Sequence, residues 1–585
     1  MRRSLQSPST SAPLAHSSPL QLAAVTGLRG CANQFGRASA AQKLSLLRKC
    51  STGAVIDADV LLAYHDCLLF LLAYPESAQL HAITRRELAR VATAARAIVQ
   101  GGNARMRAKL ANSGVAWAPM TIAFGYDIAR WLAIRHPRHA EVDSFDAAGA
   151  SLANVLRHAL PPLEFELLAT GEHDSQDFLA QASEGHRGSR LTWLVAQIAR
   201  LPCGEELQEL LFDSLHAFIT ISPAATPLSR TFVRGPATKI FFHRDGLRRV
   251  DDSRDLLAAP FAQIRPLSLA ERQHLLDAGR AMLASLGRET DAIAAASPGG
   301  IEFHVLDRGV TIALYTMVPG RRLPLDSHVG FMLFKNSVPV GYGGAWPFLG
   351  TAKIGVNIFT PYRGGESAYL FCQVLRVYAQ RFGVDHFVAE PSQFGGGNKE
   401  GLESGAFWFY YRLGFRPVES KISALAAHEF ERMRVAPRYR SPLAILRRFT
   451  RSDIELKYAL APANAAREAL PACDPADLSL AVSSWIATRF HGNRDRAMRS
   501  AVRKVSLALG TRGAARWPPS ERAAFESFCL LLALIPDLAQ WPARDKARAI
   551  ALARAKGGNE FRYFDLLRKH LRLQSALRAV SAPGA

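Results

Sequence analysis

The middle of the chain contains the pattern that most constrains its fold. An apolar run at 353–360 is followed by an Arg-Gly-Gly turn, a helical pattern at 367–381 and a second apolar run at 385–390. A glycine-rich loop at 393–398 and an aromatic segment at 406–412 complete the order. Strands that alternate with amphipathic helices form a sheet covered by helices, because each helix must bury its apolar stripe. The sequence therefore predicts an α/β domain here.

Two hairpins are predicted upstream of this segment, because short apolar runs are separated by turn residues. The expected strands are 302–306, 310–318, 329–334 and 338–346, with turns at 307–309 and 335–337. Such a meander would supply the strands that lie beside the run at 353–360. It supports a single large sheet and adds no chemistry of its own.

The loop after the first strand has the residues of an anion-binding turn. It reads Arg363-Gly364-Gly365-Glu366-Ser367-Ala368. Two glycines let the backbone turn tightly with its N–H groups facing outward, and the following helix adds the positive end of its dipole. Gly383 stands where this helix would be capped. The loop is therefore predicted to hold an anionic group.

A second motif lies in the aromatic segment. Its spacing is Ala-x-x-x-Tyr-x-x-x-Gly-Phe, carried by Ala406, Tyr410, Gly414 and Phe415. With Arg363 and Ala368 at the two ends of the loop, residues 302–419 resemble the GNAT superfamily of acyltransferases. The pattern of that family is a strand, an Arg/Gln-x-x-Gly-x-Gly/Ala loop, a helix, a strand and a helix with this tyrosine.

The resemblance implies a GNAT-like mixed sheet and a role for each matching residue. The loop N–H groups would bind the pyrophosphate of an acyl-CoA, and the end of the strand before the loop would bind its pantetheine. Tyr410 would protonate the departing thiolate. The residues implied in donor binding are Ile358, Phe359, Thr360, Arg363, Gly364, Gly365, Ser367 and Ala368.

The implied activity is that of an N-acyltransferase with acyl-CoA, above all acetyl-CoA, as donor. A small-molecule or protein amine would be the acceptor, in a groove near Trp346 and Phe348. An amine with a pKa of about 10 is mostly protonated at neutral pH, so a base is needed. We assign Glu390 to this role beside Tyr410, with His328 and Glu403 as alternatives.

Two of these positions can also be interpreted in another way. Tyr410 lies among Phe407, Trp408, Phe409 and Tyr411, so it also fits an aromatic core. Glu366 stands where the GNAT pattern has glycine: its carboxylate would repel a pyrophosphate, or it would stabilise the first turn of the helix. Two other functions therefore stay open, a GNAT-like enzyme that takes its acyl group from aminoacyl-tRNA and a GNAT-like module that binds without catalysis.

The length of 585 residues predicts several domains. We expect a disordered tail at 1–56, a helical domain without strands at 57–222, the GNAT-like domain with its lead-in at 223–460, a linker at 461–474 and a second helical domain at 475–585. Within the lead-in, a strand is predicted at 238–243. A helix is predicted at 267–286, opened by a capping box of Ser268 and Glu271.

The chain is strongly basic, with a formal net charge of +22. Such a charge favours polyanions, and nucleic acid or tRNA is the partner it indicates. The alternative is an Arg-rich composition from GC-rich coding sequence, with solvated helix faces, which needs no polyanionic partner. The basic clusters are Arg244/Arg248/Arg249, Arg432/Arg434/Arg438/Arg440, Arg447/Arg448/Arg451, Arg494/Arg496/Arg499/Arg503/Lys504 and Arg562/Arg568/Lys569/Arg572.

Cysteine usage and the N-terminus bear on the compartment. Seven cysteines occur without a C-x-x-C pair, which indicates a reducing compartment, taken as the cytoplasm. The first 56 residues contain no Asp or Glu, a composition that is also typical of organellar transit peptides. No apolar run approaches the roughly 18 residues of a membrane span. His and acidic residues show no metal-ligand spacing, so no metal site is predicted.

Overall fold

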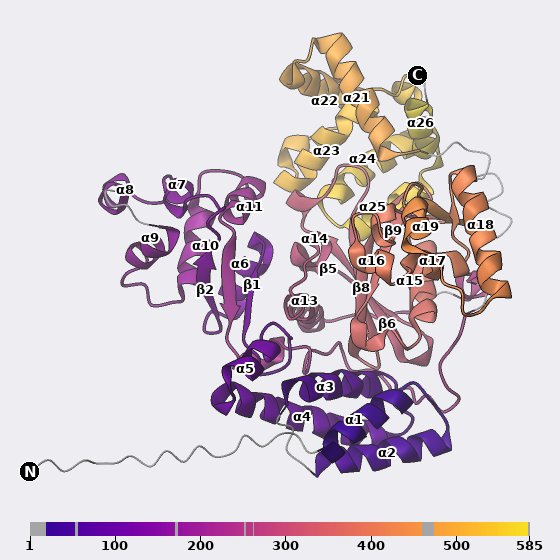
Figure 1. The fold of residues 1–585 in the computed structure, drawn as a ribbon. Helices are drawn as coiled ribbons and strands as arrows, with labels where there is room; N and C mark the ends of the chain where they lie inside the picture. The colour runs from indigo at the N-terminus through magenta and orange to yellow at the C-terminus, as the bar shows by residue number, and fades with distance from the viewer. Residues whose placement is uncertain are drawn as a thin grey trace, which may run out of the picture.

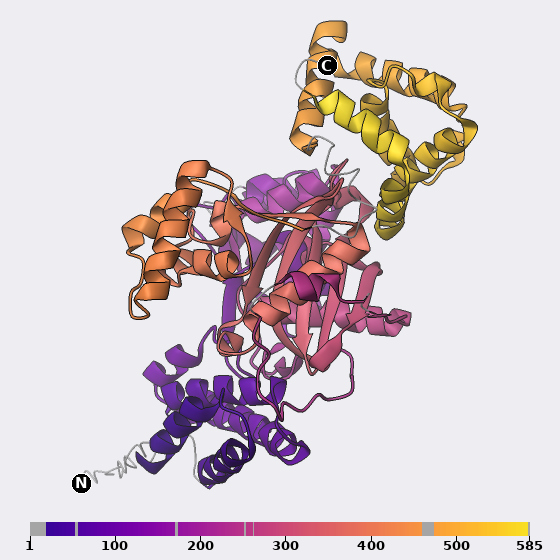
Figure 2. The same ribbon diagram turned by 90° about the vertical axis from the view of Figure 1, so that its right-hand side faces the viewer.

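The computed structural model describes residues 19–52, 57–169, 174–250, 253–260, 263–458 and 473–582. It is a mixed α/β protein with a large central sheet (Figure 1). The N-terminal helices lie below this sheet in Figure 1, the C-terminal helices lie above it, and a small α/β lobe lies to its left. Figure 2 shows the same separation of the two helical regions by the sheet.

The central sheet has nine strands in the order β11-β12-β10-β9-β8-β7-β6-β5-β4. Its strands are β4 (Gln263–Ile264), β5 (Ala296–Val305), β6 (Val310–Met317), β7 (Val329–Lys335), β8 (Val338–Phe348), β9 (Thr351–Ile358), β10 (His386–Ala389), β11 (Arg416–Pro417) and β12 (Ile454–Lys457). All neighbours are antiparallel except β9 and β10, which run parallel. Both predicted hairpins are confirmed, and β5 begins six residues before the predicted start at 302.

Helices cover this sheet and connect its strands. They are α12 (Arg254–Ala258), α13 (Leu269–Ala284), α14 (Asp291–Ala294), α15 (Ser367–Phe382), α16 (Lys399–Glu403), α17 (Ala406–Arg412), α18 (Ser420–Val435) and α19 (Leu443–Phe449). The predicted capping box of Ser268 and Glu271 opens α13. Gly383 ends α15 with a φ of 70°, as predicted, because a left-handed cap favours glycine.

Residues 19–52 are largely helical, which corrects this part of the predicted disordered tail at 1–56. Five helices pack together in the N-terminal region: α1 (Pro19–Cys31), α2 (Arg37–Ser51), α3 (Ala58–Ala73), α4 (Ala78–Gly101) and α5 (Ala104–Leu110). Leu28 and Leu47 of the first two helices are fully buried. Lys43 is also buried, and its Nζ lies 2.6 Å from Oε1 of Glu76. Helices α1 and α2 contain no acidic residue, so the buried charge of Lys43 is balanced by a carboxylate from outside the predicted tail.

The region at 57–222 is also not wholly helical. Three short antiparallel strands, β1 (Met120–Ala123), β2 (Ala140–Phe145) and β3 (Ala217–Ile221), form a sheet in the order β1-β3-β2. The helices of this lobe are α6 (Tyr126–Arg135), α7 (Leu152–Leu156), α8 (Pro162–Ala169), α9 (Ser175–Ala182), α10 (Arg190–Arg200) and α11 (Glu205–Ser214). In β3, buried and half-buried residues alternate over only five positions, too few to stand out between helices.

The predicted strand at 238–243 is irregular backbone instead. The N–H of Phe241 donates to Oδ1 of Asn336 at 2.8 Å, and the N–H of His243 donates to the carbonyl of Pro75 at 2.8 Å. The apolar residues of this segment therefore pack between the N-terminal helices and the β7–β8 turn, and do not form a strand. The segment connects the two regions rather than joining the sheet.

The C-terminal region is helical as predicted. It consists of α21 (Pro475–Phe490), α22 (Arg494–Leu509), α23 (Pro519–Leu532), α24 (Ala543–Gly557), α25 (Glu560–Lys569) and α26 (Leu571–Ser581). Buried Lys556 attaches it to the sheet domain, because its Nζ lies 2.9 Å from Glu560 and also donates to the carbonyl of Asp326 at 2.7 Å. Most of the predicted linker, 461–472, lies outside the described residues.

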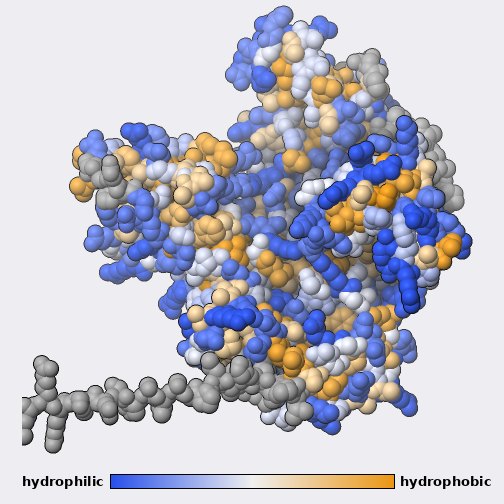
Figure 3. Space-filling model, in the orientation of Figure 1, coloured by the Kyte–Doolittle hydropathy of each residue, from blue (hydrophilic) through white to orange (hydrophobic). Residues whose placement is uncertain are grey.

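The described helices include none that is both long and apolar enough to cross a membrane. The face drawn in Figure 3 is hydrophilic over large areas, with hydrophobic residues in separate patches.

Candidate active site

Strands β9 and β10 pair for only part of their length. Their register joins His386 to Thr351, Phe387 to Ala352 and Val388 to Lys353, and stops there. Strand β9 continues to Ile358 and is paired beyond Lys353 only with β8, on its other side. The β10 side of residues 355–358 is therefore a strand edge, with backbone groups available to an extended ligand.

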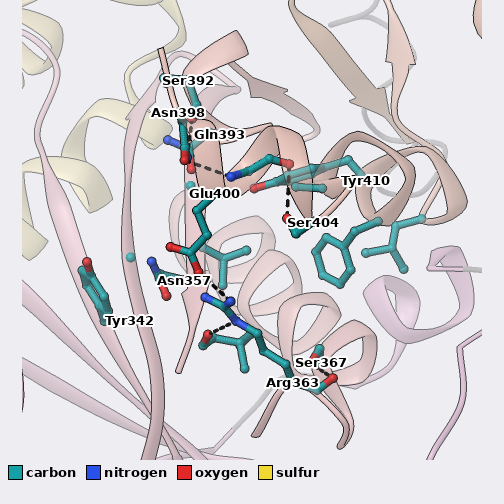
Figure 4. A pocket seen from close by; sticks show the side chains of 18 of the residues that line it. Tyr342, Asn357, Arg363, Ser367, Ser392, Gln393, Asn398, Glu400, Ser404 and Tyr410 are labelled. Carbon is teal, nitrogen blue, oxygen red and sulfur yellow. Dashed lines mark hydrogen bonds and ion pairs between the residues drawn. The ribbon is translucent and has the colours of Figure 1, made fainter. Parts of the chain in front are cut away.

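A cleft of about 740 Å³ opens at this edge. One wall is formed by β8 and β9, the other by α16 and α17, and the loop before α15 closes one end. Figure 4 shows Tyr342 and Tyr410 on opposite sides, with Asn357, Glu400 and Arg363 between them. A site of this volume and mixed lining suits a small organic ligand.

The start of helix α15 presents backbone donors to the cleft. No side chain caps this helix, and Leu370 is the first residue whose N–H bonds to the carbonyl of Glu366. The N–H groups of Ser367 and Ala368 belong to the first turn and have no intrahelical acceptor. Both residues line the cleft. This end of the cleft therefore favours an anion.

Arg363 lies beside these donors and is held in place. Its Nε donates to the carbonyl of Ile358 at 3.0 Å, and its Nη1 lies 2.6 Å from Oε1 of Glu400. The hydrogen bond from Arg363 lowers the pKa of Glu400. Because the Arg363 side chain is 40% exposed, solvent and an anionic ligand both have access to it.

Glu366 turns away from the cleft and into the protein core. Its side chain is fully buried, with Nζ of Lys335 at 2.6 Å, Nη2 of Arg308 at 2.7 Å and the backbone N–H of Arg248 at 2.7 Å. The carboxylate is therefore not placed beside a pyrophosphate, and the alternative position at the start of the helix agrees with the structure to within one residue. The residue occupies the N-cap position of α15 and joins three distant segments.

The charges of this network are set by competing effects. Burial raises the pKa of Glu366, but the attraction and hydrogen bond of Lys335 outweigh it, so the pKa lies below its usual value. Burial lowers the pKa of Lys335 to about 8, against the attraction of Glu366. At pH 7 both groups are therefore charged, and the pair is ionised inside the protein.

Tyr410 both lines the cleft and belongs to an aromatic core. Its ring packs edge-on against Phe371 and Phe415, with centroids 5.5 and 5.4 Å away. Burial raises the pKa of its hydroxyl well above the usual range, against a hydrogen bond from the backbone of Val356. The hydroxyl therefore stays protonated at neutral pH and lies at the free edge of β9, where it can donate a proton.

The structure separates the three candidate bases. His328 lines the cleft, with its ring stacked on Trp346 at a centroid distance of 4.2 Å. Burial lowers the pKa of His328, so the ring is neutral at pH 7. Glu390 lies outside the cleft lining and pairs with Lys353 at 3.0 Å. Glu403 is also outside it, 3.8 Å from Lys399.

The residues predicted to bind a donor divide into two groups. Ile358, Arg363, Ser367 and Ala368 line the cleft. The others do not: Phe359 is buried with its ring against Tyr342, Thr360 lines a smaller hollow, and Gly364 and Gly365 line a hollow on the other side of the loop. For the acceptor groove, Trp346 is in the cleft and Phe348 is not.

Sequence reasoning missed Tyr342, Asn357 and Glu400, which also line the cleft. Asn357 carried a usable signal, because it is a polar residue inside an apolar strand. Its buried Oδ1 has no hydrogen-bond partner among the described residues, so it is an acceptor available to a ligand. Within the same described ranges, no three His, Cys, Asp or Glu side chains gather as a metal site would require.

The buried network around Glu366 predicts that acid weakens the fold. His243 packs among Tyr74 and Phe241, and burial lowers its pKa to about 3. Between about pH 6.5 and 3 the unfolded chain therefore binds more protons than the folded chain. Glu366 has the same effect below about pH 4.5, because its carboxylate takes up a proton more readily in the unfolded chain. The free energy of unfolding, measured in urea, is expected to fall as the pH is lowered from 7 to 4.

A His243→Phe variant is the control for this prediction, because phenylalanine fits among the aromatic rings and does not titrate. Its stability should fall less steeply between pH 6.5 and 5 than that of the wild type. Equal slopes for the two proteins in this range would mean that His243 does not contribute.

Comparisons of the chain with protein-family models, with curated proteins and with solved structures give no match.

Proposed function

We propose that this protein is an N-acyltransferase that moves an acyl group from acyl-CoA to an amine. The observation that carries the proposal is the convergence, in one cleft, of the free β9 edge, the uncapped start of α15 and the protonated hydroxyl of Tyr410. These three features agree with the GNAT-like pattern in the sequence. A GNAT-like sheet, in which β9 and β10 are the diverging parallel pair, is part of this proposal.

An acyl-CoA fits the residues that are present. The edge of β9 at 355–358 offers backbone partners to the amide groups of pantetheine. The N–H groups of Ser367 and Ala368, with the guanidinium of Arg363, suit the pyrophosphate. Glu366 does not oppose this binding, because its carboxylate is buried with Lys335 and Arg308 on the other side of the loop.

Two side chains would move the protons. His328 is neutral and can accept the proton that the amine loses as its nitrogen bonds to the acyl carbon. Tyr410 can give its hydroxyl proton to the sulfur as the carbon–sulfur bond breaks. The products are then an amide and a free thiol. With His328 inside the cleft and Glu390 outside it, we assign the base to His328 in place of Glu390.

The aminoacyl-tRNA donor is the second candidate, and the net charge of +22 favours it. The orientation of Glu366 removes the other argument for it, since no carboxylate faces the loop from that position. A binding module without catalysis stays the third candidate, because the aromatic core around Tyr410 accounts for its position without a reaction. Calorimetry of the purified chain with acetyl-CoA tests the leading proposal: micromolar binding is expected, and absence of binding would reject acetyl-CoA as donor.

Ser367→Glu separates donor binding from stability. A carboxylate in the first turn of α15 favours the helix by roughly 0.3–1 kcal/mol, so thermal stability should be unchanged or slightly higher. The same charge would lie beside the pyrophosphate, so affinity for acetyl-CoA is expected to fall by about tenfold or more. Calorimetry and thermal unfolding measure the two effects.

Ser367→Gln is the matched control, with nearly the same shape and no charge. It should bind acetyl-CoA almost as the wild type does. If Ser367→Glu bound acetyl-CoA with unchanged affinity, the start of α15 would not be the pyrophosphate site.

A further inference from the structure

A second hollow, of about 570 Å³, lies on the other side of the donor loop. Its lining includes Gly364 and Gly365, the two loop glycines that do not face the cleft. The opposite part of the lining is the segment 244–249, which was noted in the sequence as a basic cluster and has no role in the chemistry above. The loop therefore has the cleft on one side and this second hollow on the other.

The basic hollow, as we call it, carries three exposed arginines, Arg244, Arg248 and Arg249. None of their guanidinium groups pairs with a carboxylate among the described residues, whereas those of Arg308 and Arg381 in the sheet domain do. Among the described residues that line the hollow, Asp245 is the one acidic residue. Three guanidinium groups around one concave surface favour a phosphate, which they can bind through paired N–H donors.

The backbone of this segment is fixed by the buried network. Glu366 accepts the N–H of Arg248 at 2.7 Å, and Arg308, which pairs with Glu366, donates to the carbonyl of Gly246 at 2.8 Å. The residue that follows the loop glycines therefore holds the basic segment against the loop. A glycine at 366 could not do this.

The basic hollow and the cleft are lined by neighbouring residues of the same two segments. Along the loop, Arg363 lines the cleft and Gly364 lines the hollow; along the segment, Val250 lines the cleft and Arg249 lines the hollow. At Gly364 the loop carries no side chain, and nothing lies within 4 Å of where a Cβ would be, so a ligand whose pyrophosphate lies at Ser367 can pass over the loop there.

We propose that the basic hollow binds the 3′-phosphate end of the donor nucleotide. This inference rests on the proposed function and deepens it, because it makes the enzyme selective for coenzyme A over dephospho-coenzyme A, which lacks this phosphate. Arg248 and Arg249 are the residues that supply the selectivity. They belong to the lead-in of the sheet domain, outside the segment that carries the GNAT-like motifs.

The test compares the two ligands on the wild-type chain by calorimetry. Coenzyme A is expected to bind at least about tenfold more tightly than dephospho-coenzyme A, as charged hydrogen bonds to a phosphate allow. Equal affinities would overturn the inference and leave the proposed function intact. Binding of neither ligand would overturn both.

The double variant Arg248→Gln/Arg249→Gln locates the phosphate site. It should bind dephospho-coenzyme A as the wild type does and lose the preference for coenzyme A. The matched control is Arg499→Gln/Arg503→Gln on α22, which removes the same charge from exposed positions of the C-terminal helices and should keep the preference. A preference retained by the Arg248/Arg249 variant would place the 3′-phosphate elsewhere and overturn the inference. If this variant fails to fold, the comparison of the two ligands on the wild-type chain still tests the inference.

Discussion

Tyr410→Phe is expected to lower kcat by roughly 10²- to 10⁴-fold, the usual contribution of a general acid. Donor affinity should change little, because in the proposed reaction the hydroxyl acts only on the leaving sulfur and the aromatic ring keeps its contacts with Phe371 and Phe415. Release of free thiol from acetyl-CoA, in the presence of a pooled panel of amines, measures turnover. Calorimetry measures binding on the same samples.

Tyr411→Phe is the control for this experiment. Tyr411 is the next residue of α17 and is also buried, but it is not among the residues that line the cleft. Its variant should keep wild-type turnover. Full activity in Tyr410→Phe would show that the thiolate leaves without a proton from this residue.

Glu366→Gly is expected to destabilise the protein by about 3–5 kcal/mol, although glycine is the residue of the GNAT pattern at this position. The variant leaves Lys335 buried without its partner and leaves the N–H of Arg248 without an acceptor. Urea unfolding at pH 7 measures the loss. Glu366→Gln, which keeps the shape and removes the charge, should also be clearly destabilised.

Glu400→Gln serves as the comparison, because its ion pair with Arg363 is about half exposed. Pairs of this kind contribute at most about 1 kcal/mol. A stable Glu366→Gly protein with higher affinity for acetyl-CoA would mean that the carboxylate faces the cleft, which contradicts the buried network.

Local patterns predicted the sheet domain well. The turns after β5 and β7, the capping box of α13 and the glycine cap of α15 each depend on a few neighbouring residues, so the sequence contains them directly. Helices α1 and α2 were missed for the opposite reason. Helix α2 depends on an ion pair between Lys43 and Glu76, which are 33 residues apart, and no local pattern contains it.

The same distinction applies to the site. Ile358, Arg363 and Tyr410 could be assigned because each stands at a fixed offset in a short motif. The orientation of Glu366 could not, since its partners Lys335, Arg308 and Arg248 lie 31, 58 and 118 residues before it. The choice of His328 over Glu390 likewise depends on which strand ends meet at the cleft.

Tyr74, which ends helix α3, has a consequence for how the chain can be divided. Its hydroxyl accepts the N–H of Glu366 at 3.4 Å, and its ring lies so close to Gly365 that a Cβ there would come within 2.8 Å of it. The N-terminal helices therefore pack against the loop before α15 and support it. One buried cluster also runs from Ala24 to Leu577. Cutting the chain near residue 222 would remove Tyr74 and with it this support, so a fragment that begins there is expected to lose the geometry of the loop and of the cleft beside it.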